Sequence, residues 1–173
     1  KGKDIAVVGG GDTAMEEATY LTKFAKKVYL LVRGDEHSMK ASQIMKQEAK
    51  ENKQIEILFH TEVTEVLGDT AVSGVGIVNN QTQEKRQLEV QGLFVAIGHK
   101  PNTDFLGSAV DTEKGYVRVT DNTHTSTDGV FAAGDVHDYR YRQAITAAGL
   151  GCMAALDAMA YIRGGHKNIG TNW

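Results

Sequence analysis

The sequence predicts an α/β fold built around a parallel sheet. Two apolar runs, residues 5–8 and 28–32, flank a glycine-rich turn and a helical stretch, which is the pattern of a strand–helix–strand unit with strands buried on both faces. Residues 63–90 then alternate apolar and polar side chains, as antiparallel strands with one solvated face do. A third apolar run, residues 93–97, indicates a return to the parallel sheet.

The elements of this first half follow from the same periodicities. In the first helix Met15, Ala18 and Leu21 fall on one apolar stripe, and charged residues occupy the opposite face. The remaining elements are expected at residues 41–52 (helix), 55–59 (strand), 63–67, 72–78 and 85–90 (the antiparallel meander) and 93–97 (strand).

After Gly98 the pattern is sparser. We expect two short strands, near residues 116–119 and 130–132, and a long helix over about 140–162. This helix is apolar nearly all round and must be covered by other elements, yet too few strands follow Gly98 to cover it. Cys152, within it, is expected to be a buried small hydrophobe. We therefore predict two domains, residues 1–98 and residues 99–173, of which the second is incomplete.

Composition excludes several classes of function. The net charge is −3 with interspersed charges, which argues against a nucleic-acid surface and against a polybasic membrane patch. No apolar run is expected to approach the roughly 20 residues of a membrane-spanning helix. A single cysteine excludes an internal disulfide framework, and the histidines show no metal-ligand spacing. We therefore expect a cytoplasmic protein with no metal site.

The first glycine-rich turn predicts a dinucleotide site. In the pattern Gly9-x-Gly11-x-x-Ala14, the first glycine allows a tight turn and the second lets the backbone approach a pyrophosphate. The small Ala14 lets helix and strand pack closely. The helix begins near Asp12 and Thr13, where unpaired N–H groups and the positive end of the helix dipole favour phosphate.

The residues after the second strand bear on which dinucleotide binds. Arg33 follows the strand directly and Lys40 is placed to reach back, and both favour the 2′-phosphate of NADPH. Asp35 and Glu36 lie close behind and keep NADH open, because a carboxylate accepts from a ribose 2′-OH. A charged loop without a ligand is the third interpretation.

A second candidate site lies in the other half. Gly134-Asp135 follows the apolar residues 130–132 and precedes the long helix. A carboxylate at the end of a buried strand, beside a glycine and a helix N-terminus, suits a ribose- or ribitol-like polyol.

Four stretches, taken in order, carry a resemblance to a known family: GGGDTAMEEA, GLFVAIGHKPNT, VFAAGDV and YRQAITAAGLGCMAALDA. They resemble the low-molecular-weight thioredoxin reductases, two-dinucleotide-binding flavoproteins. The resemblance implies a Rossmann-like NAD(P)H-binding domain, residues 1–98, followed by the C-terminal segment of a second Rossmann-like domain that binds FAD, residues 99–173. The resemblance also implies cofactor contacts at Gly98 and Gly134. It implies that Asp135 binds the ribitol of FAD, and that Arg142, Gln143 and Ala144 lie along the flavin ring.

The function implied by the resemblance is thioredoxin-disulfide reduction by a homodimer, with electrons passing from NADPH to FAD, to a Cys-x-x-Cys pair and to thioredoxin. The redox cysteine pair and the family's first FAD loop are absent from this chain, so no catalytic residue is assigned and the chain is expected to be an inactive fragment. Gly34 departs from the family's second arginine. The alternatives are a flavoprotein without the dithiol, similar to ferredoxin–NADP reductase, and a non-enzymatic nucleotide-binding module.

Overall fold

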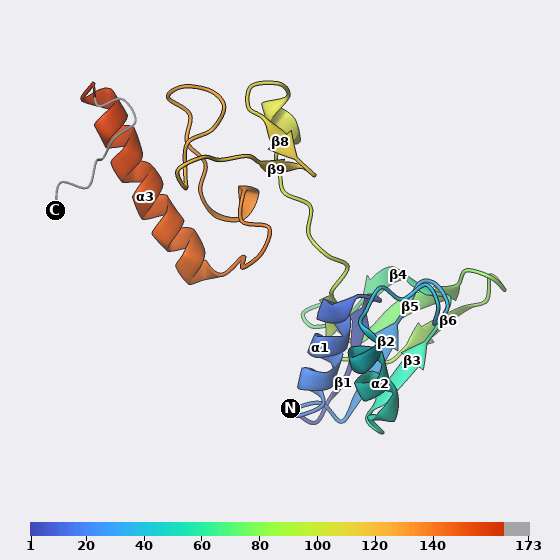
Figure 1. Cartoon of the computed structure of the whole chain (residues 1–173). Coiled ribbons are helices and arrows are strands. Elements are labelled where there is room, and N and C mark those ends of the chain that lie inside the picture. The colour runs from blue at the N-terminus through green and yellow to red at the C-terminus, as the bar shows by residue number, and fades with distance from the viewer. Residues whose placement is uncertain (165–173) are drawn as a thin grey trace. The chain divides into compact units, whose positions relative to one another are not determined.

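The computed structural model describes residues 1–164 of the 173 (Figure 1). The chain divides into two compact units, one of residues 1–98 and one from residue 99 onward.

A four-stranded parallel sheet forms the centre of the first unit. Its order is β3-β2-β1-β7, and every neighbouring pair is parallel. The strands are β1 (Asp4–Val8), β2 (Lys27–Leu31), β3 (Ile55–Leu58) and β7 (Leu93–Val95). The predicted parallel sheet is thus confirmed, including the return of the chain at β7.

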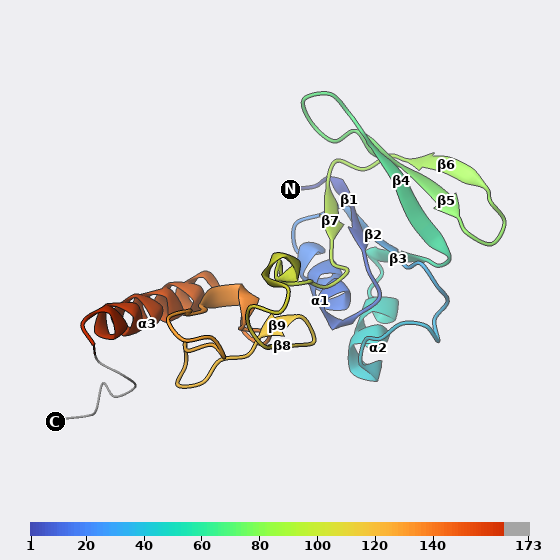
Figure 2. The same cartoon turned by 90° about the horizontal axis from the view of Figure 1, so that it is seen from above.

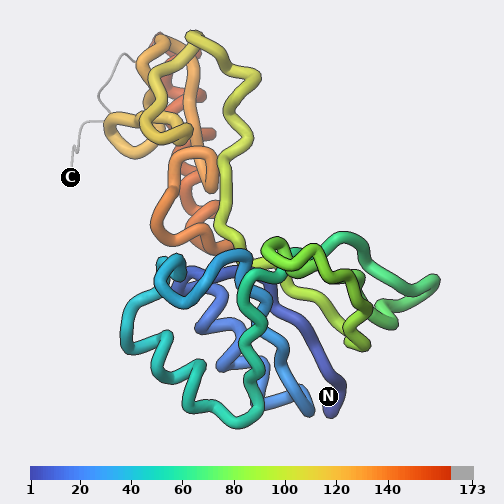
Figure 3. The backbone as a smooth tube through the Cα atoms, turned by 90° about the vertical axis from the view of Figure 1, so that its right-hand side faces the viewer, coloured from blue at the N-terminus to red at the C-terminus, as the bar shows by residue number. Residues whose placement is uncertain are grey.

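Two helices cover one face of this sheet. They are α1 (Asp12–Leu21) and α2 (Gln43–Glu51), which lie side by side (Figures 2 and 3). Met15 and Ala18 of the predicted apolar stripe are buried against the sheet together with Ala14, and Leu21 of the stripe is partly buried. Helix α2 begins two residues later than expected, because Ser42 caps it and accepts a bond from the Met45 N–H at 3.5 Å.

A three-stranded antiparallel sheet covers the other face. It has the order β4-β5-β6, with β4 at Thr61–Leu67, β5 at Gly74–Asn79 and β6 at Lys85–Leu88. Successive residues of β1 divide between the two cores: Val7 packs with the helices, and Ala6 packs with Val75 and Ile77 of β5. The period-2 alternation of residues 63–90 therefore reflects one face on this second core.

The second unit contains little regular sheet. Its elements are η1 (Asp104–Leu106), β8 (Thr112–Glu113), β9 (Tyr116–Val117), η2 (Gly134–Val136) and α3 (Ala144–Ile162). The strand expected at 116–119 is shortened to β9, which forms an antiparallel hairpin with β8. The strand expected at 130–132 is wrong: only Phe131 pairs, in an isolated bridge with His124, since the unit offers it no neighbouring strand.

Helix α3 begins at Ala144, not near residue 140 as expected, because residues 138–142 form a separate turn. No residue of α3 is buried. Ile145 and Ile162 are each 81% exposed. Cys152 is exposed as well, which corrects the expectation that it is buried. The shortage of covering strands noted in the sequence is the cause.

Helix α3 also corrects the expectation that no apolar run approaches the length of a membrane span. With 19 residues and a mean hydropathy of 1.5, it is long and apolar enough by length and composition. The core helix of a soluble protein has the same length and composition but is mostly buried, whereas no residue of α3 is buried. Asp157, within the helix, accepts a hydrogen bond from the Thr123 side chain, and a carboxylate inside a membrane is costly.

Replacing Asp157 is expected to loosen the contact of α3 with residues 120–131. The Thr123 side chain is fully buried and donates to Asp157 Oδ2, so Asp157→Ala leaves a buried hydroxyl unpaired at a cost of about 1–3 kcal/mol. Faster hydrogen exchange at the Ala132 amide, which bonds Thr123 O at 2.9 Å, would report this. The control is Asp128→Ala, at an exposed carboxylate 3.5 Å from the Tyr161 hydroxyl. Equal exchange in both variants would contradict the assignment.

Candidate functional site

The turn between β1 and α1 has the geometry of a close-packed glycine loop. Gly9 has φ 152°, and a Cβ added there would lie 2.3 Å from the Ala96 carbonyl oxygen and 2.8 Å from the Ala14 Cβ. Ala14 itself is fully buried. A Cβ added at Gly11, by contrast, meets nothing within 4 Å. Gly9 therefore serves internal packing, whereas Gly11 faces open space that a ligand can enter.

The start of α1 carries unpaired donors. Gly11 is its N-cap, and the Gly11 carbonyl accepts the first helical bonds, from Ala14 and Met15 at 3.1 and 3.2 Å. Within residues 1–164, the backbone N–H groups of Asp12 and Thr13 have no hydrogen-bond acceptor. Such N–H groups at the positive end of a helix dipole form an anion site.

The loop that follows β2 folds back onto this turn. The Lys40 N–H donates to Gly10 O at 2.8 Å, and the Ser42 N–H donates to Asp12 Oδ1 at 2.7 Å. The Asp12 carboxylate is thereby tied to the start of α2. Lys40 is exposed and lies beside the glycine turn, in the region where the sequence places it.

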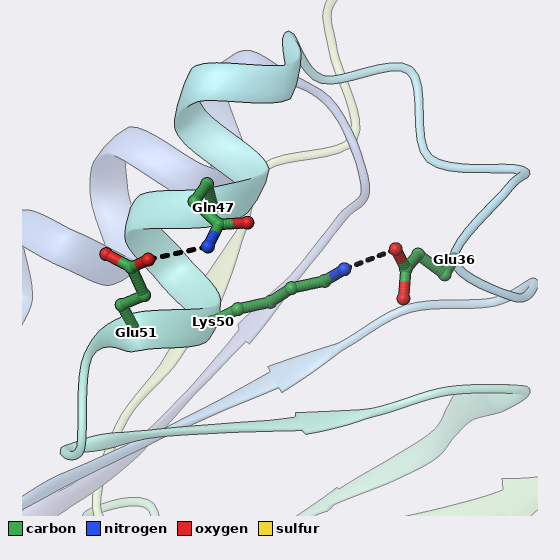
Figure 4. A network of polar contacts seen from close by, with 4 residues as sticks. All are labelled: Glu36, Gln47, Lys50 and Glu51. Carbon is green, nitrogen blue, oxygen red and sulfur yellow. Dashed lines mark hydrogen bonds and ion pairs between the residues drawn. The ribbon is translucent and has the colours of Figure 1, made fainter.

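Both carboxylates that kept NADH open are engaged elsewhere. Asp35 Oδ1 accepts the Ser38 N–H at 2.8 Å, and this bond holds the pKa of the Asp35 carboxyl below its usual value. Glu36 forms an ion pair with Lys50 of α2 (Figure 4), which lowers the pKa of the Glu36 carboxyl. Each contact occupies one oxygen of the carboxylate, and the second oxygen of Asp35 and of Glu36 can still accept from a ribose hydroxyl.

Arg33 is exposed at the end of β2. Its guanidinium has no hydrogen-bond or ion-pair partner in the described part of the chain, but its backbone is held: Asn80 Nδ2 donates to Arg33 O at 2.8 Å. Gly34, the departure from the family pattern, has a local cause. A Cβ at position 34 would lie 2.1 Å from Ser38 Oγ, because the Asp35–Ser38 turn folds over it.

Gly98 lies near the same edge of the sheet. Val95 of β7 pairs with Val8 of β1, so the residues after β7 follow beside the residues after β1. Gly98 has φ 91°, and a Cβ there meets nothing within 4 Å. The carboxyl edge of the parallel sheet thus brings together Gly9, Gly11, Asp12, Thr13, Ala14, Arg33, Lys40 and Gly98.

The other predicted residues lie together in the second unit. Gly134 is buried with φ 76°, and a Cβ there would sit 3.5 Å from the Cβ of Ala147 in α3. Asp135 is exposed beside it on η2. The close contact of η2 with α3 therefore places a carboxylate near the start of the helix, as the sequence predicts.

The residues before α3 form a tight turn. Arg142 has φ 49°, and its Nη1 lies 3.0 Å from His99 Nδ1. Because a guanidinium only donates, Nδ1 of His99 accepts here. Gln143 is the N-cap of α3 and Ala144 its first residue. The turn itself is held by Asp138, a residue that the sequence analysis did not single out.

Two open surface pockets lie elsewhere. One of about 250 Å³ lies between α1 and α2, beside Met15, Tyr20 and Met45. Another of about 420 Å³ lies beside Tyr116 and Tyr139. Neither pocket is lined by a predicted site residue, as fits a dinucleotide site that opens at a sheet edge. Residues 1–164 contain no group of three or more side chains suited to a metal; His166 lies outside this range.

A model of the pyridine nucleotide-disulphide oxidoreductases matches residues 1–151. The chain belongs to this family. It is 51% identical to a thioredoxin reductase of Mycolicibacterium smegmatis over 92% of its own length and 51% of the relative's. A thioredoxin reductase of Dictyostelium discoideum is also 51% identical, over 94% of this chain and 51% of that one.

Solved thioredoxin reductases share the fold. The structure from Giardia duodenalis superposes with a TM-score of 0.74 at 43% identity, over 94% of this chain and 54% of that one. The structure from Streptococcus pyogenes gives a TM-score of 0.79 at 34% identity, over 95% and 54%. The chain thus spans about half the length of the relatives it matches. The predicted Rossmann-like α/β class is confirmed, and the family implies FAD and NADPH as cofactors.

Proposed function

We propose that this chain supplies the NADPH site and part of the FAD site of a thioredoxin-disulfide reductase. The observation that carries the proposal is the turn from Gly9 to Ala14: an open backbone and unpaired N–H groups at the carboxyl edge of a parallel sheet. Relatives named thioredoxin reductase along nearly the whole chain support the reaction.

The first unit binds the nicotinamide nucleotide in this proposal. The N–H groups of Asp12 and Thr13 hold the pyrophosphate, and Gly11 lets it approach. Arg33 and Lys40 hold the 2′-phosphate, and the exposed Arg33 guanidinium at the end of β2 is the group that carries this preference. This arrangement favours NADPH over NADH.

The second unit supplies part of a flavin site. The exposed carboxylate of Asp135 accepts from the ribitol, and Arg142, Gln143 and Ala144 lie along the flavin ring. When bound, FAD supplies the transfer of reducing equivalents from the nicotinamide to a disulfide. With one cysteine, the exposed Cys152, this chain has no dithiol of its own, and the redox pair of the reaction lies outside these 173 residues.

The partners follow from the same proposal. Thioredoxin is the disulfide substrate and the working protein is a homodimer. The net charge of −3 and the single cysteine favour a cytoplasmic protein that binds neither nucleic acid nor membrane.

The test is a fluorescence titration of the purified chain with NADPH and NADH. We expect NADPH to bind more tightly, and Arg33→Ala to weaken NADPH by roughly 10- to 100-fold with NADH unchanged, since a hydrogen bond to a charged group contributes about 1.5–3 kcal/mol. The control is Arg86→Ala, which removes an exposed arginine from β6 of the same unit. Failure of the parent chain to bind either nucleotide would refute the proposal, and equal losses for both would refute the role of Arg33.

A further inference from the structure

Asp138 connects the two stretches of the proposed flavin site, residues 134–135 and residues 142–144. Its backbone N–H donates to Gly134 O at 2.9 Å, which ties it to the first stretch. Its carboxylate faces the second. One residue thus contacts both parts of the site without belonging to either.

The carboxylate binds three consecutive backbone N–H groups. Oδ1 accepts from Arg140 at 3.0 Å and from Tyr141 at 2.8 Å, and Oδ2 accepts from Arg142 at 3.0 Å. These bonds, that of Tyr141 first, hold the pKa of the Asp138 carboxyl below its usual value, so the group is charged at neutral pH. Both oxygens are needed, because each serves a different part of the turn.

The first turn of α3 joins the same network. Thr146 Oγ1 accepts the Gln143 N–H at 3.2 Å, and it lies 2.9 Å from Gln143 O and 3.4 Å from Asp138 Oδ2. Its single proton serves one of these two oxygens at a time. The N-cap of α3 is therefore held by a hydroxyl within reach of Asp138.

The backbone of Arg142 needs the hydrogen bond from its N–H to the Asp138 carboxylate, because its conformation is unfavourable. Its φ of 49° lies in the left-handed region, which is disfavoured for a residue that carries a Cβ. Its N–H points to Asp138 Oδ2, and its guanidinium reaches His99. Without an acceptor at Oδ2, the backbone at position 142 loses the bond that compensates this conformation.

We propose that Asp138 is a positioning residue for the flavin: its carboxylate holds Arg142 in the left-handed conformation, so that Gln143 and Ala144 present the start of α3 to the ring. The inference rests on the proposed flavin role of residues 142–144. It adds a residue that acts through the turn and does not touch the cofactor.

The first test uses this chain and no flavin. Asp138→Asn keeps one acceptor oxygen and replaces the other by an amide that only donates. We expect backbone chemical shifts of Arg142 to leave the left-handed region and exchange at the Arg142 amide to rise at least about 10-fold, with the Ala132 amide unchanged as a monitor of the fold. Asp104→Asn, an exposed carboxylate paired with Lys100 in the same unit, is the matched control. Because the one oxygen of Asn can turn toward either set of N–H groups, Asp138→Ala, which removes both acceptors, is measured beside it, and an unchanged Arg142 in Asp138→Ala overturns the inference.

The second test uses the encoded protein that carries this chain, purified with its flavin. Asp138→Asn is expected to weaken FAD by roughly 10- to 100-fold and Asp138→Ala by more, with NADPH affinity unchanged because that site lies in the other unit. Flavin affinity equal to the parent's, or equal losses of FAD and NADPH, overturns the inference and leaves the proposed function standing. A parent protein that binds no flavin refutes the proposed function itself.

Discussion

Gly9→Ala is expected to destabilise the first unit strongly. The added Cβ would lie 2.3 Å from a backbone oxygen, that of Ala96, and 2.8 Å from the buried Ala14 Cβ. Neither neighbour is the far end of a flexible side chain, so β7 or α1 must shift. The residue would also have to adopt φ 152°, which only glycine does readily. Together the strain and the overpacking cost about 3–5 kcal/mol, a large part of the stability of an ordinary domain.

The measurement is thermal unfolding followed by far-ultraviolet circular dichroism, with a fall in Tm of more than about 10 °C expected. The matched control is Gly11→Ala, two residues along the same turn, where φ is −102° and the added Cβ meets nothing within 4 Å. Its cost is expected to be about 0.5–1 kcal/mol, from a poorer N-cap. Similar Tm values for the two variants would contradict the packing role of Gly9.

The fold of the first unit could be predicted from its sequence, because the hydrophobic pattern of each segment matches the way that segment is buried in the structure. The fully apolar residues 5–8 and 28–32 are strands buried on two faces, and the alternating residues 63–90 cover one of them. The glycine turn combines a glycine that packing requires with one that packing leaves open. The spacing of Gly9, Gly11 and Ala14 therefore combines two requirements: close packing of the helix on the sheet, and open backbone at Gly11.

The sequence predicts the second unit less well, because its apolar segments suggest a buried environment that the described residues do not provide. The apolar residues 130–132 predict a strand, but the unit gives Phe131 only one bridging partner. Cys152 was expected to be buried in a covered helix, and α3 is uncovered. The periodicity of a sequence indicates whether a segment is suited to a buried or an exposed environment. It does not indicate whether the same chain provides the elements that would bury it.

Side chains that hold turns escaped the sequence analysis for another reason. The side-chain amide of Asn80 donates to Arg33 O, 47 positions away in the sequence. Asp138 carries no motif of its own. In the sequence, Asp138 shows only a common pattern, an Asp that opens a turn a few residues before a helix. Their roles depend on three-dimensional placement that periodicity does not report.

Gly11→Val is expected to abolish dinucleotide binding while the unit stays folded. A Cβ added at Gly11 meets nothing within 4 Å, so the side chain enters open space and not the packed core. The same side chain would occupy the path by which a pyrophosphate reaches the N–H groups of Asp12 and Thr13. Losing two hydrogen bonds to a charged group costs about 3–6 kcal/mol, so NADPH affinity is expected to fall more than about 100-fold.

Fluorescence titration with NADPH measures the loss, and circular dichroism of the same sample shows whether the fold is kept. Gly11→Ala provides a graded control, because one methyl group should weaken binding less than an isopropyl group does. Since the clash concerns the pyrophosphate, Gly11→Val should weaken NADH as much as NADPH, whereas Arg33→Ala affects NADPH alone. NADPH binding by folded Gly11→Val at the parent's affinity would move the nucleotide away from the turn between β1 and α1.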